Sequence, residues 1–367
     1  MTKQIKYYTL FLMLFLLHQT ALSQDNLKLL GAKAYNSLEK NLRTTEKLAN
    51  ELLDKATKSK SNSHIINAYT ILGILNKNKG YYISSLNYYL KALNFSERIQ
   101  DNGRVSASLN NIGVIYQLQN NYETAIKYFN KSLKLEDKLN FPLQKSIRYY
   151  NIGDCYKEIK SFDLALSYFN NSLIIEQKFN NTEGIIYAQL GIAEVYLEIG
   201  QVDDSKRILD KIAANLKTEF IESNIIYNKL LGVYSFKKVD MAKALNLFTI
   251  AKDISLKYKY PNHLLEIYKC EIKVFEYLKN WIALSAKYKQ LIELNDQLSA
   301  IEIRNKIHDL TYNNELHKKE IQISRIQGER DFAEKMNVFT NKLTWFLVIM
   351  LISVVVFVFY GVSKRKK

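Results

Sequence analysis

The chain has 367 residues and a formal net charge of +16. It contains only 2 prolines and 12 glycines, which argues against a disordered or low-complexity protein. No two glycines lie closer than seven residues, which excludes the dinucleotide-binding loop and the P-loop. The positive charge could favour an acidic partner or a membrane surface. The lysines, however, are scattered at helical spacing among glutamates, as on solvated helix faces. No arginine-rich stripe with interleaved aromatic residues is present, so nucleic acid is not an expected partner.

Residues 1–23 are typical of a secretory signal peptide. Lys3 and Lys6 precede an apolar run, and Ala21-Leu22-Ser23 supplies small residues at the −3 and −1 positions of a cleavage site. The alternative is an uncleaved anchor, for which the apolar run is short. The sequence therefore predicts that the chain is exported from Gln24 onward.

The next segment repeats itself about every forty residues. In one unit, Gly113 is followed by Tyr122, Ala125 and Phe129, which gives a small residue on each of two helices and aromatic residues around them. Such a period must be settled before other features are interpreted. Stepping from Gly113 in both directions finds six units in phase, marked by Gly73, Gly113, Gly153, Ala193, Gly232 and Ile272.

The turns between the helices keep the same phase. Pro142 and Pro261 each lie eleven residues before a marker, where proline ends one helix and begins the next. Seven residues after each marker the chain should leave a helix, and glycine or asparagine suits the left-handed backbone found there. These positions are Gly80, Asn120, Lys160, Gly200, Val239 and Lys279.

This order of small and aromatic residues resembles the tetratricopeptide repeat (TPR), in the longer-helix variant that has an Asn-Asn-hydrophobic-small signature. The likeness is strongest at Gly73, Gly113 and Gly153, while Ile272 has lost the small residue. The fold class implied is all-α: a TPR-type helical-hairpin solenoid over 61–298, preceded by a degenerate pair over 24–60. The alternative is a helical bundle whose spacing is accidental.

After the repeats, 299–342 carries dense mixed charge and indicates one long helix. Ile303, Leu310 and His317 step by sevens, interleaved with Ile307, Asn314 and Ile321, which is a short heptad seam. Two interpretations are open for this charged stalk. In the first, it forms a coiled coil that makes a homodimer. In the second, it is a monomeric helix that folds back on the last repeat.

Residues 343–362 contain no charge and predict a transmembrane helix, because twenty helical residues rise about 30 Å. Trp345 and Tyr360 lie near its ends, as interfacial aromatic residues do. The basic tail 363–367 would mark the cytoplasmic side. The expected location is thus the inner membrane, single-pass, with the repeats on the extracytoplasmic side.

No motif for catalysis, a metal or a cofactor is found. The exported chain has four histidines and no His-Glu-x-x-His or paired-cysteine spacing. Cys155 and Cys270 belong to units three repeats apart, too far for a disulfide, and are expected to be small buried hydrophobic residues. We therefore expect a protein that is not an enzyme and takes no metal or cofactor.

The TPR resemblance implies a concave groove lined by the first helix of each unit. Residues two and three before each marker, and one and four after it, face this groove in the family. Asn111 and Asn151 match the asparagine that binds the backbone of an extended peptide; alternatively, they hydrogen-bond neighbouring helices. The predicted peptide- or protein-binding residues are Asn110, Asn111, Val114, Gln117, Tyr150, Asn151, Asp154, Lys157, Leu190, Glu194 and Lys229.

The whole layout resembles bacterial sensors in which an exported TPR domain is joined by a helix to a kinase or DNA-binding domain, but 363–367 is too short for either output. We therefore expect a membrane-anchored periplasmic protein that binds a peptide or protein partner, as the sensory half of a signalling system. The alternatives are a structural scaffold or adaptor for an envelope complex without ligand-dependent signalling, and a degenerate sensor that has lost its output.

Overall fold

A computed structural model describes residues 24–38 and 40–365 of the chain. The predicted signal peptide, 1–23, lies outside these described residues. Within them, regular secondary structure is entirely helical. A first helical segment over 24–36 is followed by α2 Leu42–Lys58, α3 Asn62–Asn78, α4 Tyr82–Arg98, α5 Asn102–Leu118, α6 Tyr122–Leu139, α7 Pro142–Glu158, α8 Phe162–Lys178, α9 Thr182–Glu198, α10 Val202–Ala213, α11 Ile221–Lys237, α12 Met241–Tyr258, α13 Pro261–Tyr277 and α14 Trp281–Arg365.

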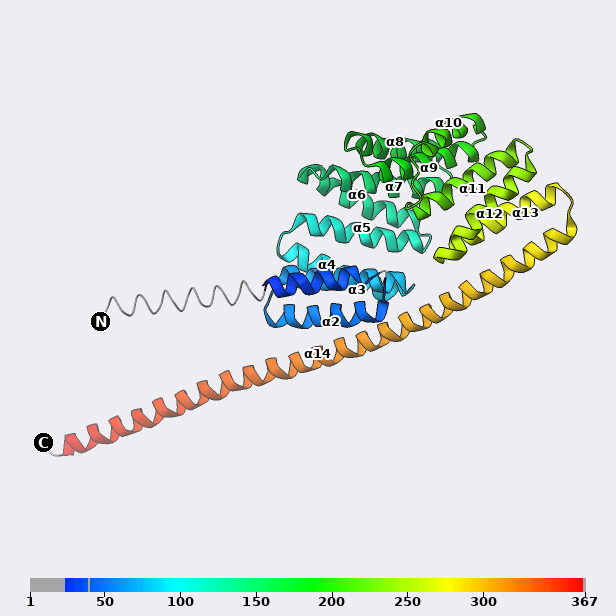
Figure 1. Cartoon of the computed structure of the whole chain (residues 1–367). Helices are drawn as coiled ribbons and strands as arrows, with labels where there is room; N and C mark the ends of the chain where they lie inside the picture. Colours follow the sequence, from blue (N-terminus) through cyan, green and yellow to red (C-terminus); the bar gives the residue numbers. More distant parts are fainter. Residues whose placement is uncertain (1–23, 39, 366–367) are drawn as a thin grey trace. The chain divides into compact units, whose positions relative to one another are not determined.

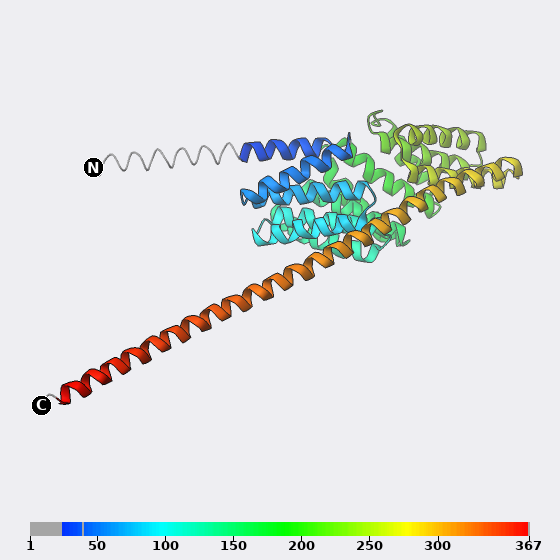
Figure 2. The ribbon, with the colours of Figure 1, turned by 90° about the horizontal axis from the view of Figure 1, so that it is seen from below.

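Helices that follow one another in the chain also lie side by side, from α2 to α13 (Figures 1 and 2). The tightest pairs are hairpins, such as α5 with α6 and α7 with α8. From α5 onward, the first helix of each hairpin also contacts the first helix of the next: α5 contacts α7, α7 contacts α9, α9 contacts α11 and α11 contacts α13. This arrangement is a helical-hairpin solenoid, in which each unit buries its apolar face against its neighbours, and the predicted all-α solenoid is confirmed.

The marker glycines allow the two helices of a hairpin to approach closely. A Cβ atom added to Gly113 would lie 2.6 Å from the ring of Phe129, and one on Gly232 would lie 2.5 Å from Phe248. Phe129 is fully buried and Phe248 nearly so. An aromatic ring therefore occupies the space that any larger marker residue would need, which is why a small residue and an aromatic residue recur sixteen positions apart.

The turns also lie where the repeat phase predicts them. All six positions seven residues after a marker have a left-handed backbone, including Lys160, Val239 and Lys279, which are not the favoured glycine or asparagine. Pro142 and Pro261 begin α7 and α13, where a missing N–H costs nothing. Asn121 caps α6 by accepting a hydrogen bond from the backbone of Thr124.

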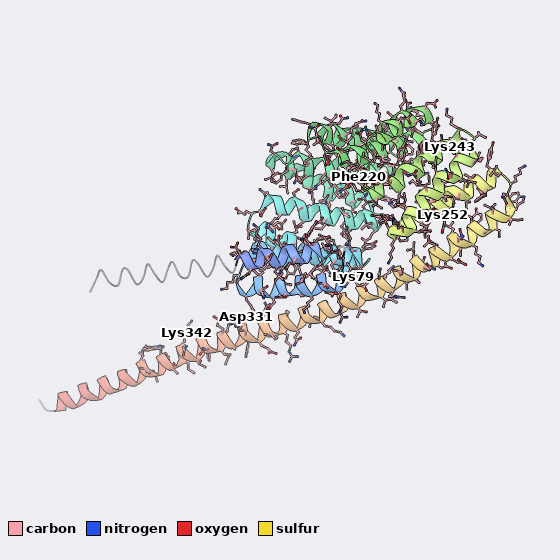
Figure 3. The ribbon with its side chains drawn as sticks, in the orientation of Figure 1. Lys79, Phe220, Lys243, Lys252, Asp331 and Lys342 are labelled. Atoms are coloured by element: carbon pink, nitrogen blue, oxygen red, sulfur yellow. The ribbon has the colours of Figure 1, made fainter. Side chains whose placement is uncertain are left out.

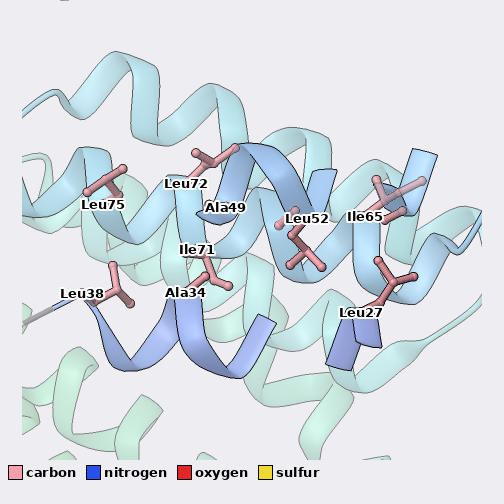
Figure 4. Close-up of a cluster of buried hydrophobic side chains, with 11 residues drawn as sticks. Leu27, Ala34, Leu38, Ala49, Leu52, Ile65, Ile71, Leu72 and Leu75 are labelled. Atoms are coloured by element: carbon pink, nitrogen blue, oxygen red, sulfur yellow. The ribbon is translucent and has the colours of Figure 1, made fainter. Parts of the chain in front are cut away.

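The N-terminal helices pack onto the repeats through a shared apolar core. Leu27 and Leu38 come from the segment that precedes α2, Leu52 from α2, and Ile71 from α3 (Figure 4). All four side chains are almost fully buried. The helix pair over 24–58 is thus continuous with the α3–α4 hairpin.

Helix α14 runs without interruption through the ranges predicted as the end of the last repeat, the charged stalk and the membrane span. The described part of the chain divides into two compact units, one up to residue 309 and the other from residue 310 onward. Within the first unit, the side-chain amide of Asn305 donates a 3.0 Å hydrogen bond to the carbonyl oxygen of Lys79, which is labelled in Figure 3. Ile303 and Ile307 of the predicted heptad seam are exposed, while the side chains of Leu310, Asn314 and His317 are not among those described.

One prediction is contradicted. A helix needs about 20 consecutive apolar residues to cross a bilayer core. Among the residues that the structure describes, no helix combines that length with sufficient apolar character. The predicted single span over 343–362, and with it the inner-membrane location, is therefore wrong.

Candidate functional site

A row of polar side chains crosses four consecutive first helices, α5, α7, α9 and α11. The amide of Gln117 donates to Asp154 at 2.7 Å. The ammonium of Lys157 lies 2.9 Å from Asp154 and 2.9 Å from Glu194. Lys229 contacts the other oxygen of Glu194, also at 2.9 Å. Five residues predicted to line the groove are thus linked on one face of the solenoid.

The charges in this row stabilise one another. Burial works against the charged form of Glu194, but the ammonium groups of Lys229 and Lys157 hold the pKa of its carboxyl well below the usual range. Burial likewise opposes the charge of Lys157 and Lys229, yet Glu194 raises the pKa of both. The row is therefore ionised at neutral pH and internally paired, so it joins the first helices rather than presenting a free cationic clamp.

The two candidate peptide-binding asparagines differ in their contacts. The amide of Asn151 donates to Asn110 on the preceding first helix at 3.2 Å. The side chain of Asn111 is half-buried and makes no hydrogen bond with any of the described residues. The alternative reading, that both amides hydrogen-bond neighbouring helices, thus describes Asn151 and not Asn111.

The remaining predicted residues have different surroundings. The ring of Tyr150 lies 5.4 Å from that of Phe169 and 6.1 Å from that of Tyr187. Val114 is partly buried against the α6–α7 core. Leu190 is only 2% exposed and belongs to the core between α9, α10 and α11, so it does not contribute to a groove surface.

Two cavities involve these first helices. One, of about 320 Å³, is lined by Tyr150 together with Leu143, Ile147, Glu176, Gly184 and Tyr187. The other, of about 430 Å³, is lined by Glu194 and Lys229 together with Val233, Cys270 and, from α14, Tyr288 and Leu291. The first cavity contains residues that the sequence prediction missed. A signal was present, because Ile147 and Tyr187 both lie six residues before their markers.

A second set of polar contacts links the N-terminal turns of the first helices. The hydroxyl of Tyr187 donates to Glu222 at 3.3 Å, and the ring of His263 lies 3.0 Å from the other oxygen of that carboxylate. The hydrogen bond from His263 holds the pKa of Glu222 below its usual range. These contacts were also not predicted, and they fix Tyr187 at the edge of the first cavity.

Neither cysteine forms a disulfide. Burial raises the pKa of the Cys155 thiol to about 12 and that of Cys270 to about 11, so both are poor nucleophiles at neutral pH. Among the residues described, no group of three or more histidine, cysteine, aspartate or glutamate side chains could hold a metal ion.

Comparison with known proteins identifies the repeat family. Family models described as tetratricopeptide repeat match residues 64–137, 148–178 and 187–215. The chain is a tetratricopeptide repeat protein. A search of curated proteins returns no match.

Several solved structures share the TPR fold. RapI in its apo form has a TM-score of 0.62 at 16% identity, over 75% of this chain and 99% of that one. A Rap protein complexed with Competence and Sporulation Factor has a TM-score of 0.60 at 15% identity, over 73% and 74%. Aspartyl phosphate phosphatase F from Bacillus subtilis has a TM-score of 0.60 at 16% identity, over 72% and 68%. At such identities the likeness shows the fold alone.

Proposed function

We propose that this TPR protein binds an extended peptide, or an extended segment of a protein partner, along the face formed by α5, α7, α9 and α11. The observation that carries the proposal is that this face is hollowed. Both cavities are lined by side chains from successive first helices. The first combines apolar and aromatic residues with the carboxylates of Glu176 and Glu183, which is a common composition for a binding site. Half of the residues that line the second are charged, so it suits a polar part of a ligand.

Asn111 supplies a second argument. An amide side chain offers both a donor and an acceptor, and an extended peptide presents both on each residue. Because the Asn111 amide has no partner among the described residues, it can bind a peptide unit without breaking an internal bond. Asn151 uses one N–H on Asn110 and keeps its carbonyl oxygen for a ligand.

The structural relatives support this use of the fold without fixing it for this chain. A Rap protein has been solved with Competence and Sporulation Factor bound, so a solenoid of this kind can hold a ligand. The phosphatase named among the similar structures shares the fold at 16% identity, which transfers no activity. Neither membrane anchoring nor an output domain forms part of the proposal.

A displayed library of random pentapeptides, selected against the purified full chain, tests the proposal. We expect the selected peptides to bind Asn111→Ala/Asn151→Ala about 10- to 100-fold more weakly, since each amide hydrogen bond is worth about 1 kcal/mol. The matched control is Asn50→Ala/Asn170→Ala, because both of those amides bond a carbonyl of their own helix, outside the first helices that form this face. The control should bind like the parent.

The proposal fails if no peptide is selected, or if the Asn111/Asn151 variant and the control bind equally well. Equal binding would mean that the peptide contacts another face of the solenoid. It would favour the alternative that the protein is an adaptor.

A further inference from the structure

Two buried glutamates occupy equivalent positions in successive repeats. Glu136 of α6 is 2% exposed and Glu176 of α8, forty residues later, is 4% exposed. Each accepts a hydrogen bond from a serine of the preceding first helix: Ser106 donates to Glu136 at 2.7 Å, and Ser146 donates to Glu176. The two repeats thus bury the same carboxylate in the same way.

The repeats differ in what neutralises that carboxylate. The guanidinium of Arg148, on the next first helix, lies 2.8 Å from Glu136, and its Nε donates to Ser132 at 3.0 Å. Forty residues after Arg148 the chain has Ala188. Glu176 accepts a hydrogen bond from the amide of Asn181 at 2.7 Å, but no cation among the described residues forms an ion pair with it.

Glu176 instead lines the cavity of about 320 Å³ next to Tyr150. Gly184, one turn before Ala188, makes room for the carboxylate, because a Cβ atom on Gly184 would lie 2.3 Å from the carboxyl carbon of Glu176. Two small residues, Gly184 and Ala188, therefore follow one another on α9 where the preceding repeat has Gln144 and Arg148.

A carboxylate removed from water is costly unless a cation or enough hydrogen bonds compensate it. Here the cavity gives an external cation access to Glu176. The other walls suit the rest of a basic side chain. Leu143 and Ile147 are 36% and 48% exposed and offer apolar surface for a methylene stem. The rings of Tyr150 and Tyr187 offer aromatic surface for a guanidinium.

We propose that this cavity is the subsite for one arginine side chain of the peptide ligand, with Glu176 as its anchor. The inference rests on the proposed function, since it names the chemistry of a peptide bound on this face. The ligand's guanidinium takes the place that Arg148 fills one repeat earlier. Arginine is preferred to lysine, because a planar guanidinium can donate to the carboxylate and to neighbouring groups together, as that of Arg148 does.

The pentapeptide selection described above also tests this subsite. We expect peptides selected on the parent chain to share an arginine at one position, and a synthetic peptide with citrulline there to bind at least about tenfold more weakly. Citrulline keeps the shape of arginine and removes its charge. Glu176→Gln should bind the arginine and citrulline peptides equally. The matched control Glu183→Gln removes an exposed carboxylate at the same cavity and should keep the preference for arginine.

Ala188→Arg provides a complementary variant. The substitution places at residue 188 the arginine that the preceding repeat has at Arg148. The new guanidinium should occupy the subsite beside Glu176. The variant should therefore unfold at a higher temperature and show no preference for arginine peptides. If this variant does not fold, Glu176→Gln decides the question.

The possible outcomes separate the two proposals. Peptides that bind without a shared arginine, or a preference that survives in Glu176→Gln, overturn the subsite and leave the peptide-binding face standing. Failure to select any peptide overturns both.

Discussion

Glu194 is the most strongly coupled residue of the candidate site. It joins α9 to the lysines of two other first helices, and its side chain is 22% exposed while those of Lys157 and Lys229 are 15% and 13% exposed. Removing the charge of Glu194 leaves the buried ammonium of Lys229 without an ion-pair partner among the described residues, while Lys157 keeps Asp154. An unpaired buried charge costs more than the ion pair itself contributes.

We expect Glu194→Gln to lower the free energy of unfolding by about 2–4 kcal/mol at pH 7. The folded pKa of Glu194 is depressed, so its contribution is complete above the unfolded value of about 4.3. That contribution is lost as the pH falls through the folded pKa. The gap between the urea midpoints of the parent and the variant should therefore shrink below about pH 4.

The control is Glu198→Gln, one turn further along α9, where the side chain is exposed and forms no ion pair with a described residue. Its urea midpoint should match that of the parent both at pH 7 and below about pH 4. A Glu194→Gln variant as stable as this control, or a gap that does not change with pH, would contradict the account of the polar row.

For single residues, the sequence predicted which side chains lie on the groove face better than it predicted the contacts that they make. The repeat phase placed Gln117, Asp154, Lys157, Glu194 and Lys229 on one face, and all five are linked. It also placed Leu190 there, although neighbouring apolar residues draw that side chain into the core. Only three-dimensional packing separates Asn111, which has no partner among the described residues, from Asn151, which has one.

The repeating element is a helical hairpin whose turn has one residue with a left-handed backbone. Glycine fills this place at Gly200, with φ of 82°, but in the next hairpin the residue is Val239, with φ of 65°. A β-branched residue is strained in this conformation. The side chain of Val239 is 60% exposed, so it gains little packing in return.

We expect Val239→Gly to raise the free energy of unfolding by about 0.5–1 kcal/mol, since the strain relieved exceeds the entropy that glycine adds to the unfolded chain. The reciprocal change, Gly200→Val, introduces the same strain at an equivalent turn where no neighbouring atom would clash with a Cβ. It should lower the stability by about 1–2 kcal/mol. Urea midpoints that move in the same direction for both variants would refute this explanation.

Helix boundaries inside the repeat array were predictable, because proline, asparagine and the repeat phase agree on them. The boundaries of the last helix, α14, were harder to predict. The sequence suggested breaks near 298 and 342 where charge and hydropathy change, but no proline lies between Trp281 and Arg365 and the single glycine before residue 361, Gly328, does not interrupt α14. A change in composition along a helix thus does not require a break in its backbone.

For the whole molecule, the sequence predicted the architecture through the repeat period and failed where it relied on hydropathy alone. The markers predicted the stacking of α3 to α13, because each of the four glycine markers lies at a close contact between the two helices of a hairpin. The contact from Asn305 to the carbonyl of Lys79 joins residues 226 positions apart, which no repeat period could predict. The apolar segment 343–362 was interpreted as a membrane span without any contact to support it, and the described helices contradict that interpretation.

The most direct test of the central claim is to locate the ligand on the solenoid. A pentapeptide selected on the full chain would carry a photoreactive diazirine, be cross-linked to the protein, and be mapped by mass spectrometry. We predict cross-links on the first helices α5, α7, α9 and α11, near Asn111, Tyr150 and Tyr187. Cross-links confined to the second helices α6, α8, α10 and α12, or to α14, would contradict a binding face built from the first helices.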